Sequence, residues 1–406
     1  MSEVVNIPQL RFPEFNGEWE EKALGVVATI TTGSTPSTSN NEYYDGDVAF
    51  VSPADIQGNR IVRSTKTTIT ELGLSVVREI KKRSTLFVCI GSTIGKVSQA
   101  GVNCATNQQI NALTAKNSFD NDFIYSLLEF KAPRIKLLAG VQAVPQINKS
   151  EFSRFKFTFP LLPEQQKIAA FLTAVDNKIE QLSKKQELLG EYKKGAMQQI
   201  FSQAIRFKAN DDSEFPDWEE KKLGDVCKLQ GGYAFKSAEF QKHGIPIIRI
   251  SNISNNNDFI DNRNLVYYNE IKNSDKFIIK NGDLIVAMSG ATTGKSSIYN
   301  LIEDAYLNQR VGLFKANNSL LDYGFLIQIV FSYIFATQLD SVLVAGAQPN
   351  VSSKDIEGFE ISLPSKIEQN KIANFLSSID SKIEQVGKQL DESKQFKKAL
   401  LQQMFV

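Results

Sequence analysis

Histidine and cysteine are scarce in this sequence. The only histidine among 406 residues is His243, so a histidine triad, a histidine metal cluster or a histidine general base would each rest on a single residue. We expect His243 to lie in a surface loop. Three scattered cysteines, Cys89, Cys104 and Cys227, cannot form a disulfide framework, and they are typical of small core residues in a reducing compartment.

Long apolar runs and an excess of one charge are also missing. The most apolar stretch, residues 324–339, contains Gln328, Ser332 and Gln338, and it predicts a buried helix, because it is too short and too polar to span a bilayer. The opening MSEVVNIPQL has an acidic residue and no apolar core, so we do not expect it to be a signal peptide. We therefore expect a cytoplasmic protein with no membrane partner. With 46 basic and 45 acidic residues, the chain does not coat nucleic acid generally, although a local basic patch is compatible with this balance.

The catalytic motifs that could be sought are incomplete. Ser289 stands where a phosphate-binding loop needs its first glycine, so the run from Gly290 to Lys295 predicts a tight turn between strands. The similar run from Gly91 to Lys96 is followed by Val97 and lacks the hydroxyl for a metal. No two prolines are adjacent, which excludes the adenine-methyltransferase tetrapeptide, and Glu-x-Lys triplets lie in polar runs without an acidic partner. We predict no enzyme, no metal and no cofactor bound by this chain.

The sequence is a tandem repeat. Trp19 to Gly25 returns as Trp218 to Gly224, 199 residues later, and Gly91 to Lys96 returns as Gly290 to Lys295. Residues 155–202 match 359–406 at a larger offset of 204, which indicates five extra residues in loops of the second copy. Each copy has a variable globular part followed by a better-matched tail.

Each tail predicts a long helix with one apolar seam. The apolar residues recur in steps of three and four, and the seam loosens at Gln186 and Lys193. Prolines precede both tails, and Ser365 with Glu368 forms a candidate capping box. Each helix should run about 35 to 40 residues. The predicted seam consists of Ile168, Leu172, Val175, Ile179, Leu182, Ile372, Leu376, Ile379, Ile383 and Val386.

The order of the chain constrains the geometry of these helices. The second helix begins beside the second globular part, which follows the C-terminal end of the first helix, so pairing requires the helices to run antiparallel. The alternative is that each helix packs on its own domain; the repeated seam favours the pair. We predict an α+β fold, with two mixed α/β domains separated by an antiparallel coiled coil and related by a pseudo-twofold axis. The predicted boundaries are 1–162 and 205–363 for the domains, and 163–204 and 364–406 for the helices.

Strands outnumber helices in the predicted globular parts. Runs rich in β-branched and aromatic residues predict strands at 47–52, 86–90, 245–250 and 283–288. Short helices are expected at 122–130 and 323–335. The order of the strands does not follow from these patterns.

Two surface regions are candidates for contact with DNA. Residues 56–100 carry eight basic and two acidic side chains, whereas 245–310 has seven of each but is rich in arginine and asparagine, including Asn255 to Asn257 and Asn264. Phosphates attract basic side chains, and arginine and asparagine can read base edges. A solvated surface and asparagine-rich turns are the alternatives. The candidates are Arg60, Arg63, Lys66, Arg78, Lys81, Lys82, Arg83, Lys96, Arg249, Asn252, Arg263, Lys295 and Arg310.

Two diverged domains held apart by a rigid helix pair suit a target with two spaced and different parts, such as a split DNA site. The Trp-Glu-Glu-Lys box, the Gly-x-Thr-x-Gly-Lys turn and the tail from Pro160 to Gln181, repeated from Pro364 to Gln385, resemble the specificity subunit of type I restriction–modification systems. This similarity covers essentially the whole chain.

The resemblance implies a non-catalytic subunit whose two domains each read half of a split site in double-stranded DNA. The helices would set the spacer and dock two modification (methyltransferase) subunits, and two restriction (translocase and endonuclease) subunits would complete the complex. S-adenosylmethionine, ATP and magnesium would be used by those partners. The resemblance also implies that the Gly-x-Thr-x-Gly-Lys turn and the Asn107-Gln108 pair are shared scaffold features, whereas base-reading residues vary within the family.

Three other functions are compatible with parts of the sequence. A coiled-coil scaffold with two domains that bind protein or glycan would show no salt-dependent affinity for DNA. A specificity chain could instead serve a combined cleavage and methylation subunit, as in some type II systems. An enzyme is the most distant alternative.

Overall fold

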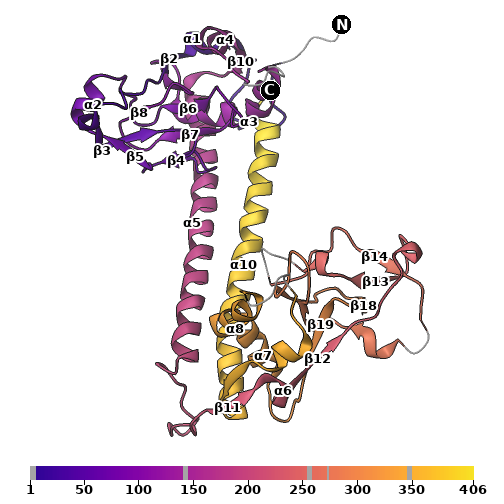
Figure 1. The fold of residues 1–406 in the computed structure, drawn as a ribbon. Helices are drawn as coiled ribbons and strands as arrows, with labels where there is room; N and C mark the ends of the chain where they lie inside the picture. The colour runs from indigo at the N-terminus through magenta and orange to yellow at the C-terminus, as the bar shows by residue number, and fades with distance from the viewer. Residues whose placement is uncertain (1–5, 140–144, 254–257, 272–273, 345–349) are drawn as a thin grey trace. The chain divides into compact units, whose positions relative to one another are not determined.

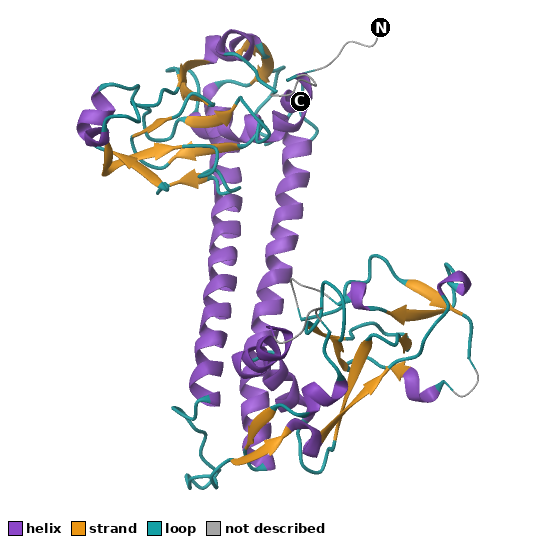
Figure 2. Cartoon of the chain, viewed as in Figure 1, coloured by secondary structure: helices purple, strands orange, loops and turns teal. Residues whose placement is uncertain are grey.

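The computed structural model describes residues 6–139, 145–253, 258–271, 274–344 and 350–406. Backbone contacts divide the chain into two compact units, Met1–Gln186 with Val386–Val406, and Glu187–Gln385. Each unit contains small sheets and short helices together with a segment from each of the two long helices (Figure 2). The predicted mixture of strands and helices is confirmed.

The first unit has three sheets. Five strands lie in the order β2-β9-β6-β7-β4, three in the order β5-β3-β8, and β1 pairs with β10. The strand β6 is buried along its whole length, as expected for the centre of a sheet. The strands are β1 (Glu20–Ala23), β2 (Ala28–Thr32), β3 (Tyr44–Val51), β4 (Ile61–Val62), β5 (Thr67–Ile69), β6 (Thr85–Val88), β7 (Val97–Ala100), β8 (Cys104–Thr106), β9 (Ile110–Ala115) and β10 (Lys156–Phe159). The helices are α1 (Leu24–Val27), α2 (Glu71–Ser75), α3 (Asn121–Leu138) and α4 (Lys149–Arg154).

The second unit also has three sheets among the described residues, with four, four and two strands. Its sheets have the orders β12-β19-β16-β17, β14-β13-β18-β15 and β11-β20. The parallel pair β3 and β8 of the first unit corresponds to the parallel pair β13 and β18. The strands are β11 (Glu219–Lys222), β12 (Cys227–Gly231), β13 (Ile245–Ile248), β14 (Val266–Tyr268), β15 (Ile278–Ile279), β16 (Leu284–Ala287), β17 (Ser296–Ile298), β18 (Ala305–Leu307), β19 (Val311–Ala316) and β20 (Glu360–Leu363). The short helices are α6 (Leu223–Val226), α7 (Tyr323–Val330), α8 (Tyr333–Val344) and α9 (Ser353–Glu357).

All four predicted strands are present, as β3, β6, β13 and β16. The helix predicted at 122–130 is confirmed as the longer α3. The single helix predicted at 323–335 is wrong, because α7 and α8 are separate helices at an angle of 54°. The Ser332 hydroxyl donates to the Ile329 carbonyl over 2.6 Å at the break, and such side-chain bonds compete with the helical pattern.

The two tails form long helices, α5 (Leu162–Phe201) and α10 (Lys366–Met404), of 40 and 39 residues (Figure 1). The predicted lengths are therefore confirmed. The candidate capping box is made only in part. The Ser365 hydroxyl accepts a 3.4 Å bond from the Glu368 N–H, but the Glu368 carboxylate binds Arg206 and Trp218.

Segments of both helices belong to each core. In the first unit, Ile168 and Leu172 of α5 are buried in one cluster with Leu400 and Leu401 of α10. These helix segments run in opposite directions, because Asp176 pairs with Lys397 while a Cβ added at Gly387 would lie 2.8 Å from Gln186 Nε2. The two predicted loose points of the seam, Gln186 and Lys193, are polar residues. Lys193 pairs with Asp380 in the second unit.

In the second unit, seam residues of α10 share a cluster with Met197, Ile200 and Phe201 of α5. The predicted seam residues Leu182 and Val386 are buried, and Val175, Ile179 and Ile383 are partly buried. The seam residues Ile372, Leu376 and Ile379 belong to that cluster, and Ile383 packs against it.

Among the described residues, no single helix is long and apolar enough to cross a membrane. Only α7 and α8 taken together across their bend meet the requirements of length and composition. The apolar side chains Phe325, Ile329, Phe335 and Leu339 of this pair lie in the core of the second unit.

Candidate nucleic-acid interface

A buried carboxylate at the start of each long helix binds the segment that leads into each domain. We call these segments, residues 10–19 and 205–218, the lead-in segments. The Glu164 carboxylate accepts two 2.8 Å bonds from Arg11 and a 3.3 Å bond from the Trp19 indole. In the second unit, Glu368 is fully buried and accepts bonds from Arg206 (3.2 and 2.9 Å) and Trp218 (3.1 Å). The repeated tryptophan box and the repeated tail are therefore two halves of one contact.

The glutamine that follows each of these glutamates holds a helix of the domain. Gln165 accepts a 3.0 Å bond from the Asp120 N–H, at the start of α3, and donates to the Pro160 carbonyl over 2.8 Å. Gln369 likewise accepts a 2.7 Å bond from the Asp322 N–H, at the start of α7. We call Glu164-Gln165 and Glu368-Gln369 the Glu–Gln anchors. In the sequence, these two residues recur in both copies of the tail, but the sequence does not reveal their contacts.

The lead-in segments also meet the C-terminal ends of the long helices. The Leu10 N–H donates to the Gln403 carbonyl of α10 over 2.9 Å. In the second unit, the Ile205 N–H donates to the Gln199 carbonyl of α5 over 3.2 Å. The same contact therefore occurs once between distant parts of the sequence and once between near neighbours.

The two Gly-x-Thr-x-Gly-Lys runs are tight turns, as predicted, between β6 and β7 and between β16 and β17. Gly91, Gly95, Gly290 and Gly294 have φ between 79° and 93°, which favours glycine. Backbone N–H groups of both turns bond to carbonyls of the turn and the preceding strand, including Gly95 to Val88. These amides hold the turns, and they do not form a phosphate cradle.

The predicted basic region of the first unit is divided by the structure. Arg60 is buried, whereas Arg63, Lys66, Arg78, Lys81, Lys82 and Arg83 are exposed and Lys96 is partly buried. Arg63 pairs with Glu180 of α5 over 2.6 Å, and Arg83 pairs with Asp122 of α3. The lysines at 66, 81 and 82 flank the starts of β5 and β6.

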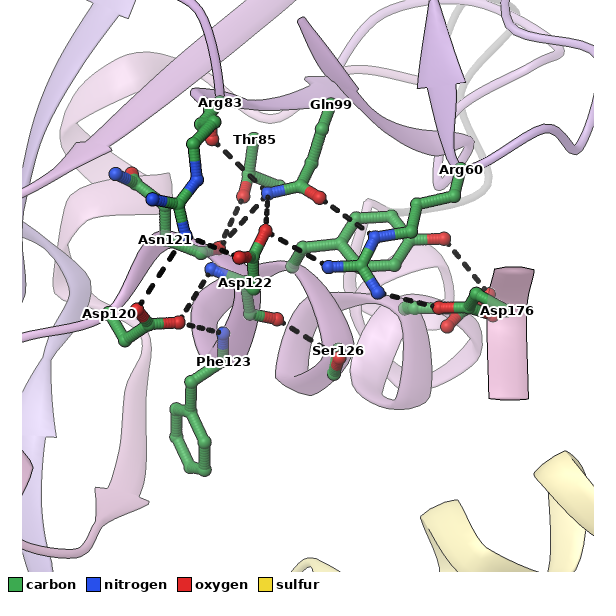
Figure 3. Close-up of polar contacts among 12 residues, drawn as sticks. Arg60, Arg83, Thr85, Gln99, Asp120, Asn121, Asp122, Phe123, Ser126 and Asp176 are labelled. Atoms are coloured by element: carbon green, nitrogen blue, oxygen red, sulfur yellow. Dashed lines mark hydrogen bonds and ion pairs between the residues drawn. The ribbon is translucent and has the colours of Figure 1, made fainter. Parts of the chain in front are cut away.

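The Arg60 guanidinium lies between α3 and α5 (Figure 3). It contacts Asp122 at 2.9 Å, Asp176 at 2.8 Å and the Gln99 side-chain oxygen at 2.9 Å. Its carbon Cζ lies 4.8 Å from the centre of the Tyr125 ring. Lys397 of α10 completes the group through Asp176, at 2.6 Å. We call these six residues the Arg60 cluster. The Arg60 guanidinium is bound by side chains of the protein itself.

Electrostatics within the cluster favour the charged form of Asp122. Burial raises the pKa of this carboxyl, but hydrogen bonds from Gln99 and Arg83, together with the charges of Arg60 and Arg83, outweigh burial and lower the pKa below its usual value. Burial, with the nearby charges of Glu129 and Asp176, raises the pKa of the Tyr125 phenol, which stays protonated.

In the second unit, the arginine and asparagine candidates form a hydrogen-bonded loop region. Asn252 is buried and donates to the Asp261 carbonyl over 3.1 Å, while Arg263 forms a bidentate pair with Asp261. Arg249 donates to the Asn264 carbonyl over 3.1 Å. Lys295 and Arg310 are exposed. Asn255, Asn256 and Asn257 lie outside the described residues.

The remaining candidates for chemistry have structural positions. Cys89, Cys104 and Cys227 are buried and free, as predicted, and burial raises the pKa of each thiol to about 12. His243 is exposed. In the part of the chain that the structure describes, no three His, Cys, Asp or Glu side chains converge as a metal site.

Comparison with known proteins shows the family. The pattern described as type I restriction modification DNA specificity domain matches residues 16–189 and 216–392. The MjaVIII specificity subunit of Methanocaldococcus jannaschii is 26% identical over 401 residues, which cover 97% of this chain and 92% of that relative. The S subunit of a type I system from M. genitalium has the same fold, with a TM-score of 0.69 at 18% identity over 98% of this chain and 99% of that one. A chain from a structural study of type I complex assembly gives a TM-score of 0.50 at 16% identity, over 96% and 97% of the two chains. Since the family pattern covers most of both copies of the repeat, this chain belongs to the type I restriction–modification DNA specificity family.

Proposed function

We propose that this chain is the DNA-recognition subunit of a type I restriction–modification complex and has no active site of its own. The observation that carries the proposal is the duplication. Two domains of matching topology are attached to the starts of two long helices by the same Glu–Gln anchor. One chain thus presents two separate recognition surfaces, as a split DNA site requires.

We also propose that α5 and α10 pair along their lengths as an antiparallel coiled coil. The ion pair of Asp176 with Lys397 in the first unit, and that of Lys193 with Asp380 in the second, support this pairing. Such a helix pair would hold the domains at a fixed separation, and this separation would set the spacer between the half-sites.

In the first domain, the proposed DNA surface comprises exposed basic residues around β5 and β6. Lys66, Lys81 and Lys82 carry exposed ammonium groups, which suit phosphate contact. Arg78, Arg83 and Lys96 extend this surface. In the second domain, Arg249, Arg263, Lys295 and Arg310 are the proposed contacts, whereas Asn252 is occupied by its own loop.

The proposed partners follow from the family. Two modification subunits would methylate adenine with S-adenosylmethionine, and two restriction subunits would use ATP and magnesium to translocate and cleave. We place the complex in the cytoplasm, where prokaryotic DNA lies.

The test is to co-express the chain with its modification subunit in a host that lacks DNA methylation, and to map N6-methyladenine across the genome. We expect one new split motif with a methylated adenine in each half. A soluble complex that adds no methylation would contradict the proposal and favour a scaffold whose domains bind protein or glycan.

A further inference from the structure

We infer that Arg60 is a positioning residue that fixes the orientation of the first recognition domain on its helices, and so sets how strictly the complex measures the spacer. This inference rests on the proposed function. It assigns to Arg60 a role other than the contact with DNA that the basic run of the sequence suggests.

The Arg60 cluster joins parts of the first unit that are distant in sequence. Arg60 immediately precedes β4, Gln99 lies in β7, and Asp122 lies in α3. Asp176 belongs to α5 and Lys397 to α10. One guanidinium therefore connects the sheet to α3 and α5 directly (Figure 3). Lys397, through its pair with Asp176, adds α10 to the group.

The exposure of these groups distinguishes the contact from an ordinary surface ion pair. The side chain of Arg60 is 7% exposed and that of Asp176 8%, whereas those of Arg63 and Glu180 are 60% and 53% exposed. Both pairs join the domain to α5, but an exposed pair adds little rigidity. A planar guanidinium with three fixed acceptors allows only a narrow range of orientations. Removing it would loosen the domain without touching the DNA surface.

The second unit shows that this contact is specific to the first domain. Its helices keep the corresponding pair, Asp380 and Lys193, 204 residues from Asp176 and Lys397. Asp258 stands at the position of Arg60. The backbone N–H of Gln99 donates to the Arg60 carbonyl, and the backbone N–H of its counterpart Ile298 donates to the Asp258 carbonyl.

The partner of Arg60 on α3 is replaced as well. Asp120 and Asp322 begin α3 and α7 and are both held by an anchor glutamine, so Asp122 corresponds to Gly324. The helix residues of the contact are thus repeated, whereas the domain residues differ: in the second unit Gln328 of α7 donates to Asp380 over 3.1 Å.

The experiment measures methylation by the co-expressed complex on DNA that carries the mapped half-sites with the native spacer, or with one base pair more or fewer. Arg60→Gln removes the guanidinium at similar size, and Glu180→Gln removes the exposed pair as the matched control. We expect Arg60→Gln to lower the ratio of native to shifted-spacer methylation about tenfold or more, since misplacement of about 1 Å can change rates by about 100-fold. Glu180→Gln should keep the ratio of the unchanged chain.

A second variant separates positioning from stability. In Arg60→Gln, the Asp122 carboxylate loses one of the positive charges that balance it. The double variant Arg60→Gln with Asp122→Asn removes this negative charge as well, and it should recover the thermal midpoint. We expect the double variant to keep the relaxed spacer preference. A double variant with the spacer preference of the unchanged chain, or a folded Arg60→Gln variant with that preference, would overturn the inference. No methylation by the unchanged complex would remove the proposed function, and the inference with it.

Discussion

Asp176 and Lys397 form an ion pair whose counterpart, 204 residues away in both partners, is the pair of Asp380 and Lys193; each pair is 2.6 Å long. The duplication has therefore preserved a contact between the two long helices, and not only the residues of each helix. Both lysines are mostly buried, with side chains 12% and 13% exposed.

Exchanging the charges of the second pair tests this contact, since among the described residues Asp380 binds Lys193 and the uncharged Gln328 rather than an arginine. Asp380→Lys should destabilise the second unit by placing two cations together. Adding Lys193→Asp should restore part of the loss, with a coupling of about 1 kcal/mol. Urea unfolding of the single and double variants measures this coupling, and simple additivity would show that the pair contributes nothing.

The Glu164 anchor should matter more for stability than a surface ion pair. Glu164→Gln leaves Arg11 and Trp19 without their carboxylate, and breaking a buried pair costs about 3 to 5 kcal/mol. The matched control is Glu14→Gln, which removes the exposed 2.5 Å pair of Glu14 with Lys167 and should cost much less stability than Glu164→Gln, because solvent screens an exposed pair. Equal unfolding free energies for the two variants would contradict a structural role of the anchor.

Acid should loosen the Arg60 cluster through Asp122. Because the folded pKa of Asp122 lies below the ordinary value of 3.8, its contribution to stability is present above that value and is lost as the pH falls through the folded pKa. The thermal midpoint of the unchanged chain should exceed that of Asp122→Asn at pH 6, and the difference should shrink below about pH 4. A difference that stays constant from pH 6 to pH 3 would exclude this origin.

The three cysteines should be inert in the folded chain. Burial raises their pKa to about 12, so almost no thiolate forms at pH 8. A thiol reagent should label none of them before unfolding and all three in denaturant, as mass spectrometry would show. Labelling of native Cys89, Cys104 or Cys227 would show that its surroundings open readily.

Lys81 and Lys82 should contribute to DNA affinity through phosphates. Replacing both by glutamine should weaken binding at low salt and reduce the slope of log affinity against log salt by about 0.9 for each lost contact. Lys156→Gln, which removes an exposed pair with Glu21, is the control. Titrations at several salt concentrations that give an unchanged slope would place the DNA surface elsewhere.

Much of the fold followed from the sequence, because duplication and periodicity are local and repeated signals. The helix lengths, the turns at Gly91 and Gly290 and the burial of the cysteines are confirmed. The break at Ser332 did not follow, since a serine in an apolar run gives no sign that its hydroxyl bonds back to the chain.

The candidate DNA contacts were harder to predict from the sequence than the fold. A run of charges does not reveal which side chain faces the core, and the partners of Arg60 lie up to 116 residues away, as for Asp176. Asn252 was selected for its amide, which its own loop uses. The pairing of Trp19 with Glu164 could have been suspected only from the fact that both residues recur in the repeat.

The contact of Leu10 with Gln403, matched by that of Ile205 with Gln199, has a consequence for how such a chain can arise. In the second unit, the peptide chain itself carries the lead-in segment to the helix end, whereas in the first unit a hydrogen bond between distant residues keeps the same position. Covalent continuity is therefore not needed at this junction. A gene whose reading order were rotated, so that the residues after Gln403 led directly into Leu10 and the chain opened at another loop, should encode the same two units.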